Sequence, residues 1–327
     1  MGIEKIEIQR LPLQEIRGKK VGEGKFVDPD FTATGDARAW VEPRQLETLW
    51  INTGSLCNLS CEHCYIESTP TNDRLAYISE VEVETLLDEI AAENFATEEI
   101  AFTGGEPFLN EELIPILRLC LQRGFKVLVL SNAMKTMTKY SDALLELNNL
   151  YTGKLNLRIS LDHYSEELHA RERGKRSWKP AIAGLKWLSS QGFSFSVAGR
   201  TYWGEPEQAM REGYASLFLK QKINLDADDV SQLILFPEMD LAVDVPEITT
   251  ACWEILQKNP AEIMCSNSRM VVKRKEDNHL SVMACTLLPY DQRFNMGKTL
   301  TEAWQPIKLN HPHCAKFCVL GGGSCSG

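Results

Sequence analysis

Three cysteines close together carry the strongest chemical signal in this sequence. Cys57, Cys61 and Cys64 lie in the segment Cys-Asn-Leu-Ser-Cys-Glu-His-Cys, directly after a short apolar run. Thiolates at this spacing can ligate three irons of a cubane [4Fe–4S] cluster from one loop, which leaves the fourth iron without a protein ligand. An open metal position distinguishes a reactive site from a structural one. The alternative is a structural zinc site, which usually takes four ligands as two Cys pairs from separate segments.

Polar residues follow the next three apolar runs of the chain. Gly104, Gly105 and Glu106 follow the second run, Ser131 and Asn132 end the third, and Ser160 and Asp162 end the fourth. Glycines let a backbone approach a ligand closely, and a carboxylate accepts the protons of an ammonium group. Parallel sheets and barrels carry their sites at the carboxyl ends of the strands, so we expect these residues to lie close to the cysteine loop.

The elements that must position these residues follow from the hydrophobic pattern. Short apolar runs predict strands at residues 49–52, 99–102, 126–130, 155–161, 193–199 and 231–236. Amphipathic stretches predict helices at residues 79–94, 111–123, 141–147, 179–191 and 206–220, the first with a capping box formed by Ser79 and Glu82. Regular βα alternation predicts an α/β fold with a parallel sheet and right-handed crossovers.

Together, the CxxxCxxC loop and the polar residues after successive strands resemble the radical S-adenosylmethionine (SAM) superfamily. The resemblance implies a partial (β/α)6 TIM-like barrel whose cluster binds SAM and splits it to a 5′-deoxyadenosyl radical. It also implies a flavodoxin- or ferredoxin-type electron donor. His63 would pack near the adenine, Glu106 would bind the amino group of SAM, and Arg173 would pair with its carboxylate. The full set of implied SAM contacts is His63, Tyr65, Gly104, Gly105, Glu106, Ser131, Asn132, Ser160, Asp162 and Arg173.

A second group of cysteines follows in the last quarter of the chain: Cys265, Cys285, Cys314, Cys318 and Cys325. The stretch between the first two predicts a β-hairpin with its turn near Asp277-Asn278. The segment resembles the SPASM extension of radical SAM enzymes or its shortened form, twitch, although it has fewer cysteines than a full SPASM domain. This resemblance implies one auxiliary [4Fe–4S] cluster held by four of the five thiols. By pattern, Cys265, Cys285 and Cys325 share one site, completed by one or both of Cys314 and Cys318, and a structural zinc site is the alternative.

Other features of the sequence exclude some classes of function. The formal net charge of −10 argues against a protein that binds a nucleic-acid backbone. The basic runs at residues 171–176 and 273–275 are typical of solvated loops. No run approaches the roughly 18 apolar residues of a membrane span. With no apolar signal segment at the N-terminus, we expect a cytoplasmic protein whose cysteines are metal ligands or free thiols. Cys120 and Cys252 lie in apolar helical patterns that predict buried core residues.

These observations predict three regions and leave three functions open. We expect an N-terminal extension at residues 1–48, a radical SAM core barrel at 49–240, and a small α+β iron–sulfur domain of the twitch or SPASM type at 241–327. A small-molecule substrate is favoured, because peptide-modifying members often carry a winged-helix recognition domain before the barrel. Modification of a ribosomally made peptide is the first alternative. A non-catalytic iron–sulfur electron carrier is the second, but it would not need the SAM-binding residues.

Overall fold

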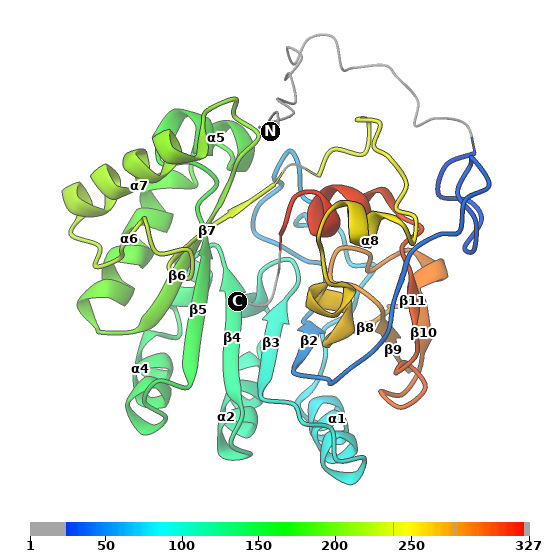
Figure 1. The fold of residues 1–327 in the computed structure, drawn as a ribbon. Coiled ribbons are helices and arrows are strands. Elements are labelled where there is room, and N and C mark those ends of the chain that lie inside the picture. Colours follow the sequence, from blue (N-terminus) through cyan, green and yellow to red (C-terminus); the bar gives the residue numbers. More distant parts are fainter. Residues whose placement is uncertain (1–23, 238, 278, 324–327) are drawn as a thin grey trace.

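The computed structural model describes residues 24–237, 239–277 and 279–323 of the 327-residue chain. Their largest element is a nine-stranded sheet in the order β10-β9-β8-β2-β3-β4-β5-β6-β7. Its curved arrangement, with helices along one side and the C-terminal segments on the other, is shown in Figure 1.

Six strands of this sheet run parallel in sequence order, which confirms the predicted α/β fold. They are β2 (Thr48–Asn52), β3 (Glu99–Thr103), β4 (Lys126–Ser131), β5 (Leu155–Ser160), β6 (Ser194–Arg200) and β7 (Leu233–Phe236). Each overlaps the strand predicted at its position. All five residues of β2 are buried, as expected for a parallel strand that is covered on both faces.

Helices follow these strands as βα alternation requires. They are α1 (Glu80–Ala92), α2 (Leu113–Gln122), α3 (Lys135–Thr138), α4 (Ser141–Leu150), α5 (Glu166–Arg173), α6 (Trp178–Ser190), α7 (Glu207–Gln221) and, later in the chain, α8 (Cys252–Ile255). The predicted capping box begins α1: the backbone N–H of Glu82 donates to Ser79 Oγ, and the backbone N–H of Ser79 donates to the Glu82 carboxylate at 2.8 Å.

Part of the C-terminal segment extends the sheet of the six parallel strands. The predicted hairpin is present as β8 (Ser268–Lys273) and β9 (Leu280–Met283), although Asn278 in its turn lies outside the described residues. Strand β8 also pairs in parallel with β2, and β10 (Asn295–Gly297) adds to β9. A separate two-stranded sheet joins β1 (Trp40–Val41) to β11 (Ile307–Lys308). The division of the chain near residue 240 stays a prediction, and the sheet is continuous across it.

Alternate residues of the strands face two different cores. Leu49 and Ile51 of β2 pack in the cluster beneath the helices, whereas Trp50 packs in a second cluster with Met270 and Phe317 from the C-terminal segment. Successive side chains of a strand point to opposite faces of the sheet, which explains why neighbouring residues pack in different clusters. The inner face of β2 is therefore covered by residues of the C-terminal third of the chain, and the same cluster includes Ala39 and Val41 from the N-terminal segment.

Two interpretations of the sequence need correction. Cys120 is fully buried as predicted, but Cys252 is only partly buried because it begins the short helix α8, none of whose residues is buried. The basic run at 171–176 is not wholly a solvated loop, since its first three residues end α5 and the side chain of Arg173 is 16% exposed. In the second run, Lys273 ends β8 and pairs with Glu82.

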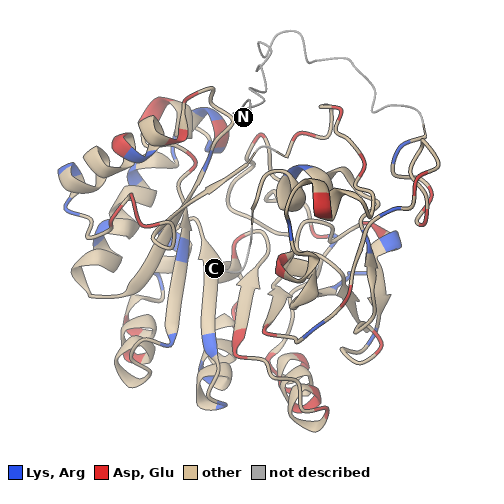
Figure 2. Ribbon diagram, in the orientation of Figure 1, with Lys and Arg blue, Asp and Glu red and all other residues tan. Residues whose placement is uncertain are grey.

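Charged residues of both signs are spread over the described helices and loops, although α1 carries acidic residues only (Figure 2). Within the described ranges, none of the helices has the length and apolar character needed to cross a membrane.

Candidate functional site

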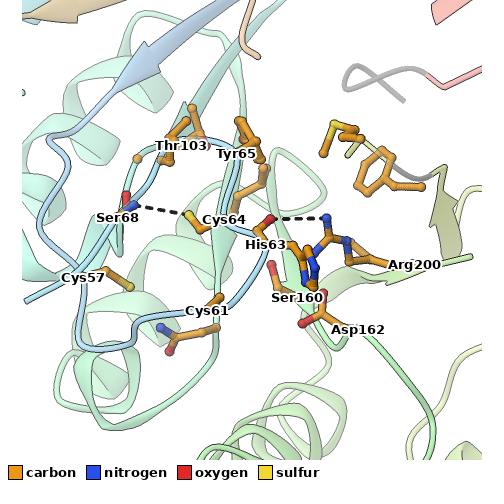
Figure 3. Close-up of a pocket in the computed structure, with 18 of the residues that line it drawn as sticks. Cys57, Cys61, His63, Cys64, Tyr65, Ser68, Thr103, Ser160, Asp162 and Arg200 are labelled. Atoms are coloured by element: carbon orange, nitrogen blue, oxygen red, sulfur yellow. Dashed lines mark hydrogen bonds between the residues drawn. The ribbon is translucent and has the colours of Figure 1, made fainter. Parts of the chain in front are cut away.

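A cavity opens at the carboxyl ends of the parallel strands. Its walls include the loop after β2, the turn after β3 and the ends of β4, β5 and β6 (Figure 3). The structure brings together here all but one of the residues predicted for the cluster and for SAM: Cys57, Cys61, His63, Cys64, Tyr65, Gly104, Gly105, Ser131, Asn132, Ser160, Asp162 and Arg173. The exception is Glu106.

The three cysteine thiols line one side of this cavity. Backbone N–H groups donate to two of the sulfurs, from Leu59 to Cys57 Sγ at 3.4 Å and from Ser68 to Cys64 Sγ at 3.3 Å. Burial raises the pKa of Cys57 to about 12 and that of Cys61 to about 11, so without metal these thiols keep their protons at neutral pH. Metal binding must displace those protons. Three thiols on one loop, with N–H donors beside the sulfurs, fit a cluster ligated through three of its irons.

Gly104 and Gly105 let the turn after β3 pack directly against the cysteine loop. A Cβ on Gly105 would lie 2.0 Å from the carbonyl oxygen of Leu56, and Gly104 adopts a φ of +143° that side-chain-bearing residues rarely take. The backbone N–H of Glu106 donates to the same Leu56 carbonyl at 3.1 Å. The two glycines therefore hold the backbone just before Cys57.

Glu106 lies behind the cavity wall. Its side chain is buried, and its carboxylate accepts hydrogen bonds from Ser131 Oγ at 2.8 Å and from the backbone N–H of Asn132 at 2.9 Å. Burial raises the pKa of Glu106 to about 7 despite these donors. The carboxylate ties the end of β3 to the end of β4, and its contact with the amino group of SAM stays a prediction.

Asp162 and Arg173 form an ion pair that also lines this cavity. Burial would raise the pKa of Asp162, but the charge and the hydrogen bond of Arg173 outweigh it and hold that pKa below its usual value. The pair places one cation and one anion beside the cysteine loop. The predicted contact of Arg173 with the carboxylate of SAM stays a prediction.

Glu172, Arg200 and Tyr202 were not predicted, and they surround His63. The Glu172 carboxylate accepts from His63 Nδ1 at 2.8 Å, from the His63 backbone N–H at 2.9 Å and from Tyr202 OH at 2.7 Å. Arg200 donates to the same carboxylate at 3.1 Å and to the His63 carbonyl at 3.3 Å (Figure 3). Arg200 could have been found as a polar residue at the end of a predicted strand, whereas no local signal marks Glu172.

A second cavity lies in the C-terminal region and is lined by four cysteines. Cys265 precedes the β8–β9 hairpin and Cys285 follows it, while Cys314 and Cys318 lie on the π-helical segment Cys314–Val319. Cys325 lies outside the described residues. Burial raises the pKa of Cys265 to about 11 and that of Cys314 to about 12.

Apart from His313, the remaining lining residues of the second cavity are apolar: Ile263, Met264, Leu287, Leu288, Phe294, Ile307 and Leu309. Within the described ranges, no three His, Cys, Asp or Glu side chains group closely enough to hold a single metal ion. Four thiols that line one otherwise apolar cavity are the donor set that a cubane cluster takes.

Leu287 lines both cavities. Its backbone N–H donates to Cys285 Sγ at 3.3 Å, while its neighbour Thr286 also lines the main cavity. The loop after β9 therefore contributes to the walls of both cavities.

Comparison with known proteins agrees with this geometry. Residues 51–211 match the model of the radical SAM superfamily. The antilisterial bacteriocin subtilosin biosynthesis protein AlbA of Bacillus subtilis (strain 168) is 36% identical over 143 residues, which are 43% of this chain and 30% of AlbA. A GTP 3′,8-cyclase of Synechocystis is 26% identical over 154 residues, 47% of this chain and 45% of the cyclase. The chain thus spans less than half the length of these curated relatives.

Solved structures share the fold at low sequence identity. Streptococcus suis SuiB bound to S-adenosylmethionine aligns with a TM-score of 0.57 at 14% identity, over 80% of this chain and 65% of SuiB. The structure of anSMEcpe with bound AdoMet aligns with a TM-score of 0.54 at 15% identity, over 81% of each chain. The family match, the cysteine loop and the parallel sheet agree, and residues 51–211 carry a radical SAM superfamily domain.

Proposed function

We propose that this chain binds a [4Fe–4S] cluster through Cys57, Cys61 and Cys64 and cleaves SAM reductively in the main cavity. The observation that carries the proposal is that the three thiols line the same cavity as the polar residues at the ends of four strands. With cluster and SAM bound, one electron would split the C5′–S bond and the 5′-deoxyadenosyl radical formed would take a hydrogen atom from a substrate.

The residues of this chain have separate tasks in that cavity. Glu172 and Arg200 fix the backbone and the ring of His63 beside the cysteines, so that the ring faces the site of the adenine. Arg173 offers a cation to the carboxylate of SAM, and Ser160 and Asp162 offer oxygens to its ribose and ammonium groups. Glu106 can contact SAM only if its carboxylate accepts a hydrogen bond from the ligand in addition to those from its present donors, Ser131 and Asn132.

We further propose that Cys265, Cys285, Cys314 and Cys318 hold an auxiliary [4Fe–4S] cluster that accepts an electron from the substrate radical. The support is the position of Leu287, which lines both cavities. The substrate would lose a hydrogen atom to the 5′-deoxyadenosyl radical, then a proton to solvent and an electron to the auxiliary site. The net result is oxidation of the substrate by two electrons.

A peptide side chain is the substrate that the cavity wall favours. One side of the main cavity is apolar, formed by Trp50, Leu130, Phe236, Met239 and Phe317, and it suits an apolar group next to the reacting carbon. AlbA, the relative at 36% identity, is named for bacteriocin biosynthesis. The small molecule expected from the sequence remains the alternative.

The iron–sulfur sites favour a reducing compartment such as the cytoplasm.

Anaerobic reconstitution with iron and sulfide, followed by SAM and dithionite, tests the proposal. We expect 5′-deoxyadenosine from the wild type and none from the Cys57→Ala, Cys61→Ala, Cys64→Ala triple variant. Equal output from both proteins would disprove the assignment of the cluster. A wild type that carries iron but forms no 5′-deoxyadenosine would instead favour the electron carrier.

The substrate class needs a separate measurement. Holoenzyme is incubated with SAM, reductant and short peptides encoded beside its gene, and the masses of the peptides are measured by mass spectrometry. A peptide oxidised by two electrons loses two hydrogen atoms and the corresponding mass. Peptides of unchanged mass, together with a small metabolite that raises 5′-deoxyadenosine output, would favour the small-molecule alternative.

A further inference from the structure

The thiol-lined cavity of the C-terminal region contains one histidine whose ring is not satisfied. His313 lines this cavity with Cys265, Cys285, Cys314 and Cys318, and it is 7% exposed. Its Nδ1 atom is buried and has no hydrogen-bond partner among the described residues. A buried polar atom without a partner is destabilising, so the folded protein should supply a partner.

The backbone around His313 is fixed, which limits where its ring can point. The backbone N–H of His313 donates to Nδ1 of His311 at 3.0 Å, and the N–H of Cys314 donates to the His311 carbonyl at 2.9 Å. The two imidazole rings lie with their centroids 4.7 Å apart. Since His311 Nδ1 already accepts a hydrogen bond, it does not serve as the partner of His313 Nδ1.

The sulfurs are the partners that this cavity offers. Its other lining side chains are apolar, and Met264 contributes only a weakly accepting thioether. Four thiols can already provide one ligand for each iron of a cubane. A ring nitrogen beside a complete ligand set acts as an N–H donor to sulfur rather than as a further ligand.

We propose that His313 donates a hydrogen bond from Nδ1 to a sulfur of the auxiliary cluster and thereby raises its reduction potential. The inference rests on the proposed function, because it requires the auxiliary cluster. Hydrogen bonds to cluster sulfurs stabilise the additional negative charge of the reduced state. A higher potential makes the site a better acceptor for the electron that the substrate radical must lose.

The test uses the full chain with Cys57, Cys61 and Cys64 replaced by Ala, so that only the auxiliary cluster remains. In this background His313→Phe keeps the ring shape without a donor. His313→Asn keeps an amide nitrogen one bond from Cγ, where Nδ1 lies in histidine. Ile307→Val is the matched control, because it changes packing in the same cavity without changing a donor. Reduction potentials are measured by redox titration monitored by electron paramagnetic resonance, and iron is counted in parallel.

We expect about four irons in every protein, the number in one cubane. The midpoint potential of His313→Phe should be lower than that of the background protein. His313→Asn should recover most of the difference, and Ile307→Val should leave the potential unchanged.

Two results would overturn the role of His313. One is a potential that does not move in His313→Phe, or that moves equally in Ile307→Val. The other is loss of iron from either His313 variant, which would make His313 a ligand or an assembly residue instead of a donor. If the background protein itself holds no iron, the auxiliary cluster is refuted directly and the role of His313 falls with it.

Discussion

The carboxylate of Glu172, at the end of α5, accepts a hydrogen bond of 2.8 Å from Nδ1 of His63, which lies between two of the cluster cysteines. A second oxygen of the same carboxylate accepts from the His63 backbone N–H. Burial would raise the pKa of Glu172, but the hydrogen bonds from His63 and the charge of Arg200 outweigh it and lower that pKa. The cysteine loop is therefore attached to α5 through a buried anion.

Glu172→Leu should destabilise the protein and weaken SAM binding together. Removing one partner of a buried ion pair leaves Arg200 uncompensated, which costs about 3–5 kcal/mol. Urea unfolding and equilibrium dialysis with SAM measure the two effects. Glu167→Gln on the same helix is the control, because its side chain is 85% exposed and should change the stability by less than about 0.5 kcal/mol. Wild-type behaviour of Glu172→Leu would mean that the loop does not depend on this contact.

Gly105→Ala should dislodge the cysteine loop. The new Cβ would lie 2.0 Å from the Leu56 carbonyl oxygen, so one of the two backbones must move. We expect a loss of at least about 1–3 kcal/mol from overpacking. Iron should fall from about eight to about four per chain, since each cubane holds four.

Gly153→Ala separates this steric effect from backbone strain alone. Gly153 has a φ of +74° with no atom near its missing Cβ, and the substitution should cost about 1–2 kcal/mol without loss of iron. Equal iron contents in the two alanine variants would argue against the role of Gly105.

Each of the four thiols in the second cavity should be needed for the auxiliary cluster, and Cys325 should not. In the background that lacks the three barrel thiols, Cys→Ser at Cys265, Cys285, Cys314 or Cys318 should lower iron from about four to near zero. Cys325→Ser should retain about four. The reverse pattern at Cys318 and Cys325 would return Cys325 to the ligand set that its sequence pattern suggested.

Stability should fall as the pH rises through the range in which Glu106 titrates. Burial raises its pKa from 4.5 to about 7, so between these values the folded state keeps a proton that the unfolded chain has released. Glu106→Gln removes this titration. The unfolding free energy of Glu106→Gln minus that of the wild type should therefore increase as the pH rises through this range, by at most about 3 kcal/mol. Urea midpoints at pH 5 and pH 8 measure the change, and a constant difference would show that Glu106 titrates normally.

Local pattern was sufficient to predict the strands and most of the site. The parallel strands β2 to β6 are buried on both faces, so their apolar runs stand out. A polar residue such as Ser131 or Asp162 marks the point where a strand meets the cavity. The cysteine spacing needs no tertiary information, because Cys57, Cys61 and Cys64 lie on one loop.

Contacts between distant segments could not be predicted in the same way. Glu172 lies on a helix with a strongly polar sequence, and its proximity to His63 and Tyr202 depends on how α5 packs beside the cysteine loop. The hairpin of β8 and β9 was visible from its alternating residues and turn, but its pairing with β2 was not. Strand pairing depends on hydrogen bonds between backbones, which the side-chain pattern of either strand does not record.

The parallel pairing of Thr48 with Ser268, at the start of β2 and β8, has a consequence for the newly made chain. During synthesis β2 is complete long before β8 leaves the ribosome, so the edge of β2 opposite β3 stays without its strand partner for most of that time. Unpaired strand edges attract other chains. A chain cut near residue 240 would keep this edge permanently, and we expect it to aggregate even though all six parallel strands are present.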